Sequence, residues 1–142
     1  MHEPLAQQKG IRLQARCEIP TEVVLCDRER ILQVFSNLLG NAIKFCRHGD
    51  QIQVTMRRVG DRVQASVADS GPGIASDDLP LVFDAYWSGA KNNRNGTGLG
   101  LYITKRIVEA HGSKIWIDSA IGRGTTVHFE LPLITGVARP DL

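Results

Sequence analysis

Residues 27–45, DRERILQVFSNLLGNAIKF, predict one long amphipathic helix. Its apolar stripe repeats at three- and four-residue spacing and consists of Ile31, Leu32, Phe35, Leu38, Leu39, Ala42, Ile43 and Phe45. A second stripe at the same spacing is polar and consists of Arg30, Gln33, Asn37, Asn41 and Lys44. Because Asn is a poor helix former, two Asn one turn apart leave two interpretations open: a solvated face, or a face that binds something.

The composition fits one soluble domain. The chain has 142 residues, 42% hydrophobic and 23% charged, which is enough for a real core. Its net charge of +2, with both signs spread along the chain, argues against nucleic acid and membrane surfaces as partners. Three cysteines without metal-ligand spacing predict reduced thiols in a cytoplasmic domain. No apolar run is long enough to span a membrane, and no signal peptide opens the chain.

Strands and helices alternate along the chain around the long helix. Apolar and polar residues alternate in predicted strands at 11–17, 51–56, 62–67 and 125–131, and short apolar strands are predicted at 23–25 and 113–118. Asp27 is the expected N-cap of the long helix, and further helices are expected at 76–87 and 99–110. The order predicts an α/β two-layer sandwich, with helices on one face of a mostly antiparallel sheet. Residues 1–10 and 134–142 are expected to be a linker and a disordered tail.

A glycine-rich turn follows the strand at 62–67. It reads Asp69-Ser-Gly71-Pro-Gly73-Ile74, a tight turn with exposed backbone. As a loop it is ordinary. As a ligand site, Asp69 would accept a hydrogen bond from an amino group, and the glycines would let a flat ring approach the backbone.

A second glycine-rich segment, Gly96-Thr97-Gly98-Leu99-Gly100-Leu101, opens the predicted helix at 99–110. Free backbone N–H groups and the positive end of the helix dipole favour phosphate there. Its spacing is neither that of a P-loop nor that of a dinucleotide fingerprint, so alone it is a weak signal. The polar stretch before it, residues 88–97, has no hydrophobic anchor and is expected to be mobile.

Five motifs in this order resemble one family. They are Asn37…Asn41-Ala-Ile-Lys44, Asp69-Ser-Gly71-Pro-Gly73, Val82-Phe83-Asp84, Gly96-Thr-Gly98-Leu-Gly100-Leu and Gly122-Arg-Gly124-Thr125. Over residues 11–133 the chain resembles the ATP-binding catalytic domain of bacterial sensor histidine kinases, in the superfamily of type II topoisomerases, MutL-type proteins and heat-shock chaperone ATPases. The resemblance implies the Bergerat ATP-binding fold: a mixed, mostly antiparallel five-stranded sheet with about three helices on one face.

The resemblance also implies a role for each matching residue. Asn41 would bind Mg²⁺ through its amide oxygen, Asn37 would support the phosphate or metal shell, and Lys44 would face the phosphates; these three are the implied catalytic residues. Asp69 would read the adenine amino group of ATP. The other implied nucleotide-binding residues are Gly71, Gly73, Ile74, Lys91, Gly96, Thr97, Gly98, Leu99, Gly100, Leu101 and Thr125. Residues 88–95 would form a lid over ATP.

The chain departs from the family pattern in two places. Arg residues frequent in the family are replaced by Ala85 and Ser88, which leaves Lys91 or Arg94 to contact the terminal phosphate. The Thr-Pro or Ser-Pro that usually follows the Lys-Phe pair is Cys46-Arg47 here. This leaves open whether Arg47 or His48 contacts phosphate or belongs to a solvated helix end.

The implied function is that of a protein histidine kinase. The γ-phosphate of ATP would pass to a histidine on a separate dimerisation domain, so this chain alone would not autophosphorylate. The alternatives are a non-catalytic nucleotide-binding module and an anti-sigma-type serine kinase. Hydrolysis is expected to be slow, because Asn37 stands where related ATPases carry Glu and an amide is no general base. Expected partners are the dimerisation domain and a response regulator, with a homodimeric whole protein, a monomeric isolated domain and a cytoplasmic location, alone or below a membrane anchor.

Overall fold

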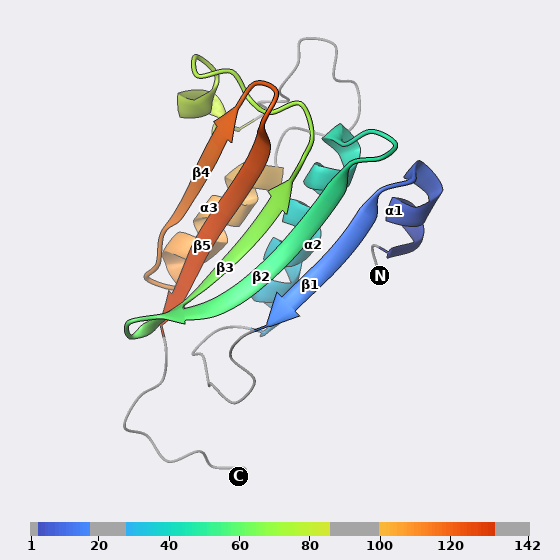
Figure 1. The fold of residues 1–142 in the computed structure, drawn as a ribbon. Coiled ribbons are helices and arrows are strands. Elements are labelled where there is room, and N and C mark those ends of the chain that lie inside the picture. The colour runs from blue at the N-terminus through green and yellow to red at the C-terminus, as the bar shows by residue number, and fades with distance from the viewer. Residues whose placement is uncertain (1–2, 18–27, 86–99, 133–142) are drawn as a thin grey trace.

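The computed structural model describes residues 3–17, 28–85 and 100–132, which form one sheet with helices on one side (Figure 1). The described elements are α1 (Glu3–Lys9), β1 (Arg12–Cys17), α2 (Arg28–Phe45), β2 (Gln51–Val59), β3 (Arg62–Asp69), the 3-10 turn η1 (Leu79–Leu81), α3 (Gly100–Ala110), β4 (Ile115–Ala120) and β5 (Gly124–Pro132). The predicted strand at 23–25, the Asp27 cap, the lid and the tail lie outside the described residues.

The sheet has five strands in the order β1-β2-β3-β5-β4. β1 pairs with β2 in parallel, and the other three pairings are antiparallel. The predicted hairpin is confirmed, since Val59 pairs with Arg62 and Gly60 takes a φ of 64° in the turn. The mixed, mostly antiparallel sheet predicted from the resemblance is therefore confirmed.

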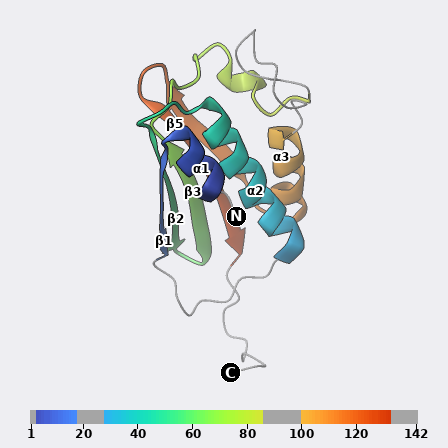
Figure 2. The same cartoon turned by 90° about the vertical axis from the view of Figure 1, so that its right-hand side faces the viewer.

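The core lies between the sheet and the helices. α2 and α3 cover one face of the sheet, while α1 lies beside β1 and α2 (Figure 2). Val34 and Phe129 have no exposed surface, and the rings of Phe35 and Phe129 meet edge to face at 5.2 Å. The predicted apolar stripe of α2 was wrong at Leu32, which is 56% exposed, because the core-facing position is taken by Val34.

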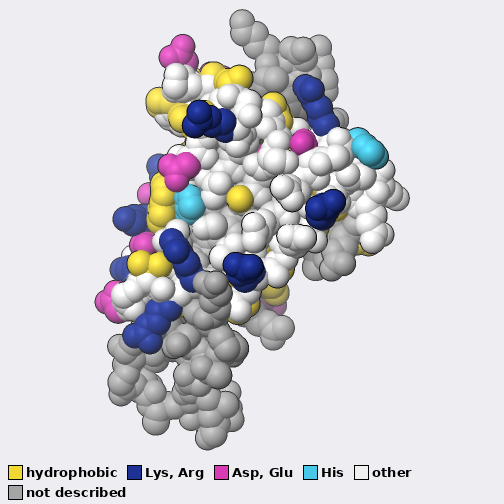
Figure 3. Space-filling model, in the orientation of Figure 1, with side chains coloured by type: hydrophobic (Ala, Val, Ile, Leu, Met, Phe, Trp, Pro, Cys, Tyr) yellow, Lys and Arg dark blue, Asp and Glu magenta, His cyan; other side chains and the backbone are white. Residues whose placement is uncertain are grey.

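The opposite face of the sheet is open, and basic and acidic side chains are spread over it (Figure 3). On this face His128 stacks on Trp116 with ring centroids 5.1 Å apart. The His128 ring lies 2.8 Å from Ser66 Oγ and 3.1 Å from Asp118 Oδ2. Ser66 lies on β3, which is paired on both sides, so the backbone N–H groups beside it belong to the sheet ladder and do not form an oxyanion site. We assign this Ser-His-Asp arrangement to sheet stability.

Residues 3–9, for which a linker was predicted, form helix α1, and Ala6 of this helix is 1% exposed. One local prediction was wrong. Instead of a helix from Ser76 onward, the described part of 76–87 contains only the 3-10 turn η1, with Pro80 inside it. Proline lacks an N–H and disfavours a helical residue before it, so the α-helix does not propagate.

Candidate functional site

A cavity of about 370 Å³ opens between the C-terminal half of α2, the ends of β3 and β5, and the loop after β3. A volume of this size suits a nucleotide base with part of its sugar. The cavity is lined by Leu38, Asn41, Ala42, Phe45, Arg47, Val67, Asp69, Pro72, Gly73, Ile74, Ala75, Asp78, Ile121, Thr125 and Val127. Five of the sequence-predicted site residues are among them: Asn41, Asp69, Gly73, Ile74 and Thr125.

Not all residues in the polar stripe of α2 line the cavity. Asn41 lines it, whereas Asn37 does not, and Asn37 Nδ2 donates a hydrogen bond to Thr104 Oγ1 of α3 at 3.3 Å. Lys44 is also outside the lining, with its Nζ 5.3 Å from the centroid of the Phe45 ring. Partial burial lowers the pKa of Lys44 from its ordinary value. The structure thus brings only Asn41 of the three predicted catalytic residues to the cavity wall.

Asp69 is held at the end of β3 by local hydrogen bonds. Its Oδ1 accepts the backbone N–H of Gly71 at 2.9 Å. Burial raises the pKa of Asp69 above its ordinary value, the backbone N–H groups of Gly71 and Thr125 act in the opposite direction, and the charge of Asp50 adds to the rise. The result is a partly desolvated carboxyl group on the cavity wall, suited to accept a hydrogen bond from a ligand amino group.

Two glycines allow the loop after β3 to lie against the β4–β5 hairpin. Gly73 has a φ of 80°, and a Cβ there would collide with the Ala120 carbonyl. Gly124 has a φ of 82°, and a Cβ there would collide with the Asp69 carbonyl. The N–H of Gly122 donates to Pro72 O at 2.9 Å across the same contact. The glycines therefore fix the cavity wall by close backbone approach.

Ser119 on β4 joins the two walls, and no sequence motif points to it. Its Oγ accepts the backbone N–H of Ile74 at 2.7 Å and donates to Gly124 O at 2.9 Å. It also lies 2.7 Å from Thr125 Oγ1. Since Ser119 pairs with Thr125 across the β4–β5 ladder, only the strand register could have revealed this contact.

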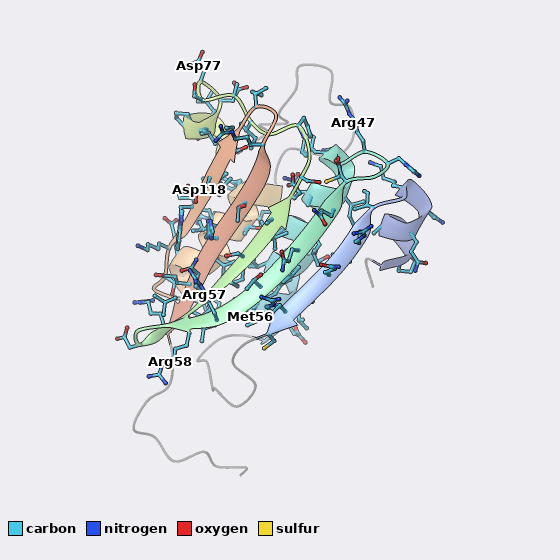
Figure 4. The ribbon with its side chains drawn as sticks, viewed as in Figure 1. Arg47, Met56, Arg57, Arg58, Asp77 and Asp118 are labelled. Atoms are coloured by element: carbon cyan, nitrogen blue, oxygen red, sulfur yellow. The ribbon has the colours of Figure 1, made fainter. Side chains whose placement is uncertain are left out.

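Of the lining residues, Ile121 was not predicted, whereas Arg47 was one of two open alternatives. Ile121, at the hairpin tip, is 68% exposed although it belongs to the cavity wall. Arg47 follows α2 and extends beyond its C-terminal end (Figure 4), and its backbone N–H donates to Asp50 Oδ2 at 2.7 Å. The sequence left open whether Arg47 or His48 contacts phosphate, and of these two only Arg47 lines the cavity.

The remaining predicted residues that the structure describes are not part of the cavity wall. Gly71 is buried behind Asp69, and a Cβ there would lie 3.0 Å from Asp69 Oδ1. Gly100 and Leu101 begin α3 and are not lining residues. Lys91, Gly96, Thr97, Gly98 and Leu99 lie outside the described residues, as do Ser88 and Arg94.

Asn41 is the side chain that the resemblance implies as a metal ligand here. Among residues 3–17, 28–85 and 100–132 no group of three His, Cys, Asp or Glu residues is arranged to hold a metal. Asn41 offers a neutral amide oxygen at the cavity wall. This donor set fits Mg²⁺ only together with water and phosphate oxygens from a nucleotide.

The paired glycines of the hairpin give a stability prediction. Gly124→Ala should destabilise the fold by about 3 kcal/mol or more, because left-handed backbone strain of about 1–2 kcal/mol adds to a collision with Asp69. Gly122→Ala is the matched control: its φ is 81°, and nothing lies within 4 Å of a Cβ there. Thermal unfolding gives the loss of stability in each variant, and the difference between the two losses is the cost of the collision alone. Equal losses for the two would show that Gly124 is needed only for its backbone angle.

The fold and the cavity define a nucleotide-binding domain of the two-layer α/β sandwich class. Residues 26–135 match the model of the family described as histidine kinase-, DNA gyrase B- and HSP90-like ATPase. The nucleotide-free catalytic domain of histidine kinase ThkA superposes with a TM-score of 0.81 at 32% identity, over 92% of this chain and 86% of that one. The chain therefore belongs to this ATPase family, and within it to the histidine kinase catalytic domains.

Further relatives agree with this assignment. The adaptive-response sensory kinase SasA of Synechococcus sp. (strain JA-2-3B'a(2-13)) is 39% identical over 129 residues, which make up 88% of this chain and 34% of that protein. A crystal structure of full-length ShkA in complex with AMPPNP has a TM-score of 0.84 at 33% identity, covering 96% of this chain and 28% of that one. The chain thus spans about a third of the length of its curated relatives.

Proposed function

We propose that this domain binds ATP together with Mg²⁺ and transfers the γ-phosphate to a histidine on a separate dimerisation domain. The observation that carries the proposal is the pairing of Asp69 and Asn41 on the wall of one cavity. A partly desolvated carboxyl group suits the adenine amino group, and an amide oxygen suits a phosphate-bound cation. The ShkA complex with AMPPNP, a nucleotide bound to a relative of the same fold, supports ATP as the ligand.

The residues of this chain bind and orient the nucleotide. Asp69 accepts the adenine amino group, while Gly73 and Ile74 let the ring lie against the loop. Asn41 holds the phosphate end, where Mg²⁺ when bound neutralises the phosphate charge. Lys44, Asn37 and the predicted lid residues are proposed to complete the phosphate site. Positioning of this kind supplies most of the catalysis in phosphoryl transfer.

Asn37 favours transfer to a protein acceptor over hydrolysis. An amide cannot remove a proton from water, and the Asn37 amide already donates to Thr104. We therefore propose slow ATP hydrolysis in the absence of an acceptor. Incubating the domain with labelled ATP and a separately supplied histidine-bearing domain tests this. Robust phosphate release without the acceptor would contradict it, and binding without any transfer would leave a non-catalytic nucleotide-binding module.

The partners and the location belong to the same proposal. The solved complex of histidine kinase ThkA with the response regulator TrrA supports a response regulator as a partner; that ThkA chain has a TM-score of 0.75 to this one at 30% identity. No described helix is long and apolar enough to span a membrane. We propose a homodimeric, cytoplasmically exposed whole protein and a monomeric isolated domain, with neither nucleic acid nor lipid as a direct partner.

Arg47 gives a prediction on affinity. Arg47→Ala should weaken ATP binding about 2- to 5-fold at low salt, because an exposed cation at the cavity mouth attracts phosphate by about 0.5–1 kcal/mol. The difference should shrink at high salt, where exposed charges are screened. Isothermal titration of ATP at two salt concentrations measures it. Arg57→Ala, on β2 (Figure 4), makes the same charge change outside the cavity, so an equal loss there would refute a local role for Arg47.

A further inference from the structure

Helix α1 is docked on the domain beside the C-terminal end of α2 (Figure 2). Ala6 is 1% exposed and Ile11, which follows the helix, is 5% exposed. The N–H of Ile11 donates to Ala6 O at 2.9 Å and closes the helix. A seven-residue helix is not stable alone, so these tertiary contacts hold it in place.

Lys9 of α1 supplies a cation to the last turn of α2. Its Nζ donates to the carbonyl oxygen of Ile43 at 2.8 Å and to that of Lys44 at 3.3 Å. The last four carbonyls of a helix have no partner within the helix, and a positive charge is favourable at that end. Lys9 therefore caps α2 from a separate element, 34 residues earlier in the chain.

The segment after α1 is also tied to the loop after α2. The carbonyl of Gly10 accepts the N–H of Gly49, and the N–H of Arg12 donates to Asp50 O, both at 3.0 Å. Gly10 has a φ of 71° and lies under the His48 ring, where a Cβ would collide. The end of α1 and the loop 46–50 thus form one hydrogen-bonded unit.

This unit is connected to the part of the cavity wall at Asp69, where adenine is proposed to bind. The Asp50 carboxylate accepts the N–H of Arg47 at 2.7 Å and the hydroxyl of Ser70 at 3.3 Å. Ser70 in turn exchanges two hydrogen bonds with Gln51 and directly follows Asp69. The contacts of α1 therefore reach the cavity wall by two routes. One passes through the last turn of α2, and the other passes through Asp50 and Ser70 to Asp69.

We propose that Lys9 is a positioning residue for nucleotide binding, which couples α1 to the cavity through the last turn of α2. Lys9 is not a lining residue, whereas Phe45 of that turn and Asn41, which directly precedes it, are. Holding the carbonyls of Ile43 and Lys44 fixes the rotation and extension of the last turn, and with it the helix end that presents Asn41 and Phe45. The inference rests on the proposed function, in that the ligand of the cavity is ATP. Since coupling is reciprocal, ATP must then also stabilise α1.

The test compares three variants of the whole chain. Lys9→Met keeps the aliphatic stem and removes the donors, Lys9→Arg keeps a donor and a charge, and Gln8→Met changes an exposed neighbour on the same helix. We expect Lys9→Met to weaken Mg-ATP binding about 5- to 20-fold, in the usual range for coupled sites. Lys9→Arg and Gln8→Met should stay within about 2-fold of wild type. Titration calorimetry gives the dissociation constants.

Hydrogen exchange supplies a readout that a merely structural role would not move. In the wild type, saturating ATP should slow exchange of the hydrogen-bonded amides of residues 7–11 by at least the factor that Lys9→Met costs in affinity. Equal ATP affinity in wild type and Lys9→Met, or no ATP effect on exchange in α1, would overturn the inference. Absence of ATP binding to the wild type would instead overturn the proposed function. The exchange measurement on wild type needs no variant, so a misfolded variant leaves the inference testable.

Discussion

Asp69→Asn is expected to weaken ATP binding about 10- to 100-fold while raising the melting temperature of the nucleotide-free protein. A hydrogen bond to a charged group contributes about 1.5–3 kcal/mol, and each 1.4 kcal/mol is tenfold in affinity. Because the Gly71 N–H holds the Oδ1 position, the introduced amide would turn its NH₂ group toward the adenine amino group, so that two donors would meet. Binding of ATP and of a nucleotide without that amino group, measured by titration, would show the loss as specific to adenine.

The gain in stability follows from the direction of the Asp69 pKa. Burial raises this pKa in the folded state, so the folded protein holds the proton more tightly than the unfolded chain, whose value is about 3.9. Stability therefore falls as pH rises from about 4 through the raised pKa, and the deficit remains at neutral pH. Asn does not ionise and escapes this penalty.

Thermal unfolding as a function of pH checks the second half of this prediction. The melting temperature of Asp69→Asn should exceed that of wild type at pH 7, and the difference should vanish below about pH 4, where the wild-type carboxyl is neutral in both states. Asp77→Asn is the control, because Asp77 is an exposed carboxylate in the loop before η1 (Figure 4). A lower melting temperature for Asp69→Asn at pH 7 would mean that its hydrogen bonds to backbone N–H groups outweigh the burial.

Periodicity predicted most of the fold because the burial of α2 and of the central strands follows the sequence pattern. Val63, Ala65 and Val67 alternate on the core side of β3, as their spacing requires. Periodicity does not predict the structure where distant contacts decide. Residues 3–9 carry no helical signal of their own, and α1 exists because Ala6 is buried and Lys9 reaches α2.

The candidate site was predictable where a residue belongs to a motif and hidden where only the sheet brings it in. Asp69 and Gly73 stand in one short motif, whereas Ser119 supports the lining residue Thr125 through its register opposite it on the neighbouring strand. Helical spacing also placed Asn37 with Asn41. Four residues advance a helix by about 40° beyond a full turn, and this rotation turns Asn37 to Thr104 of α3. The direction in which such a residue faces depends on its contacts with the neighbouring helix. Sequence periodicity carries no information about those contacts.

Asn41→Ala should remove the magnesium dependence of ATP binding. In wild type, Mg²⁺ is expected to raise ATP affinity because the Asn41 oxygen and the phosphate oxygens share the ion. Without that oxygen, affinities measured with Mg²⁺ and with EDTA should agree within about 2-fold, a loss of about 2–3 kcal/mol of metal-assisted binding relative to wild type. The affinity measured in EDTA should change little, since Asp69 and the base pocket are untouched.

Gln33→Ala is the matched control, since it removes the same amide two turns earlier on α2. Gln33 Oε1 accepts a hydrogen bond from Arg30 at 3.2 Å and lies outside the cavity lining. It should therefore keep the full magnesium effect. If Asn41→Ala kept that effect too, the ion would be held by phosphate and water alone or by residues beyond the described cavity wall. A fall in EDTA affinity as large as that in Mg²⁺ would place Asn41 at the nucleotide itself, which separates a metal ligand from a direct phosphate contact.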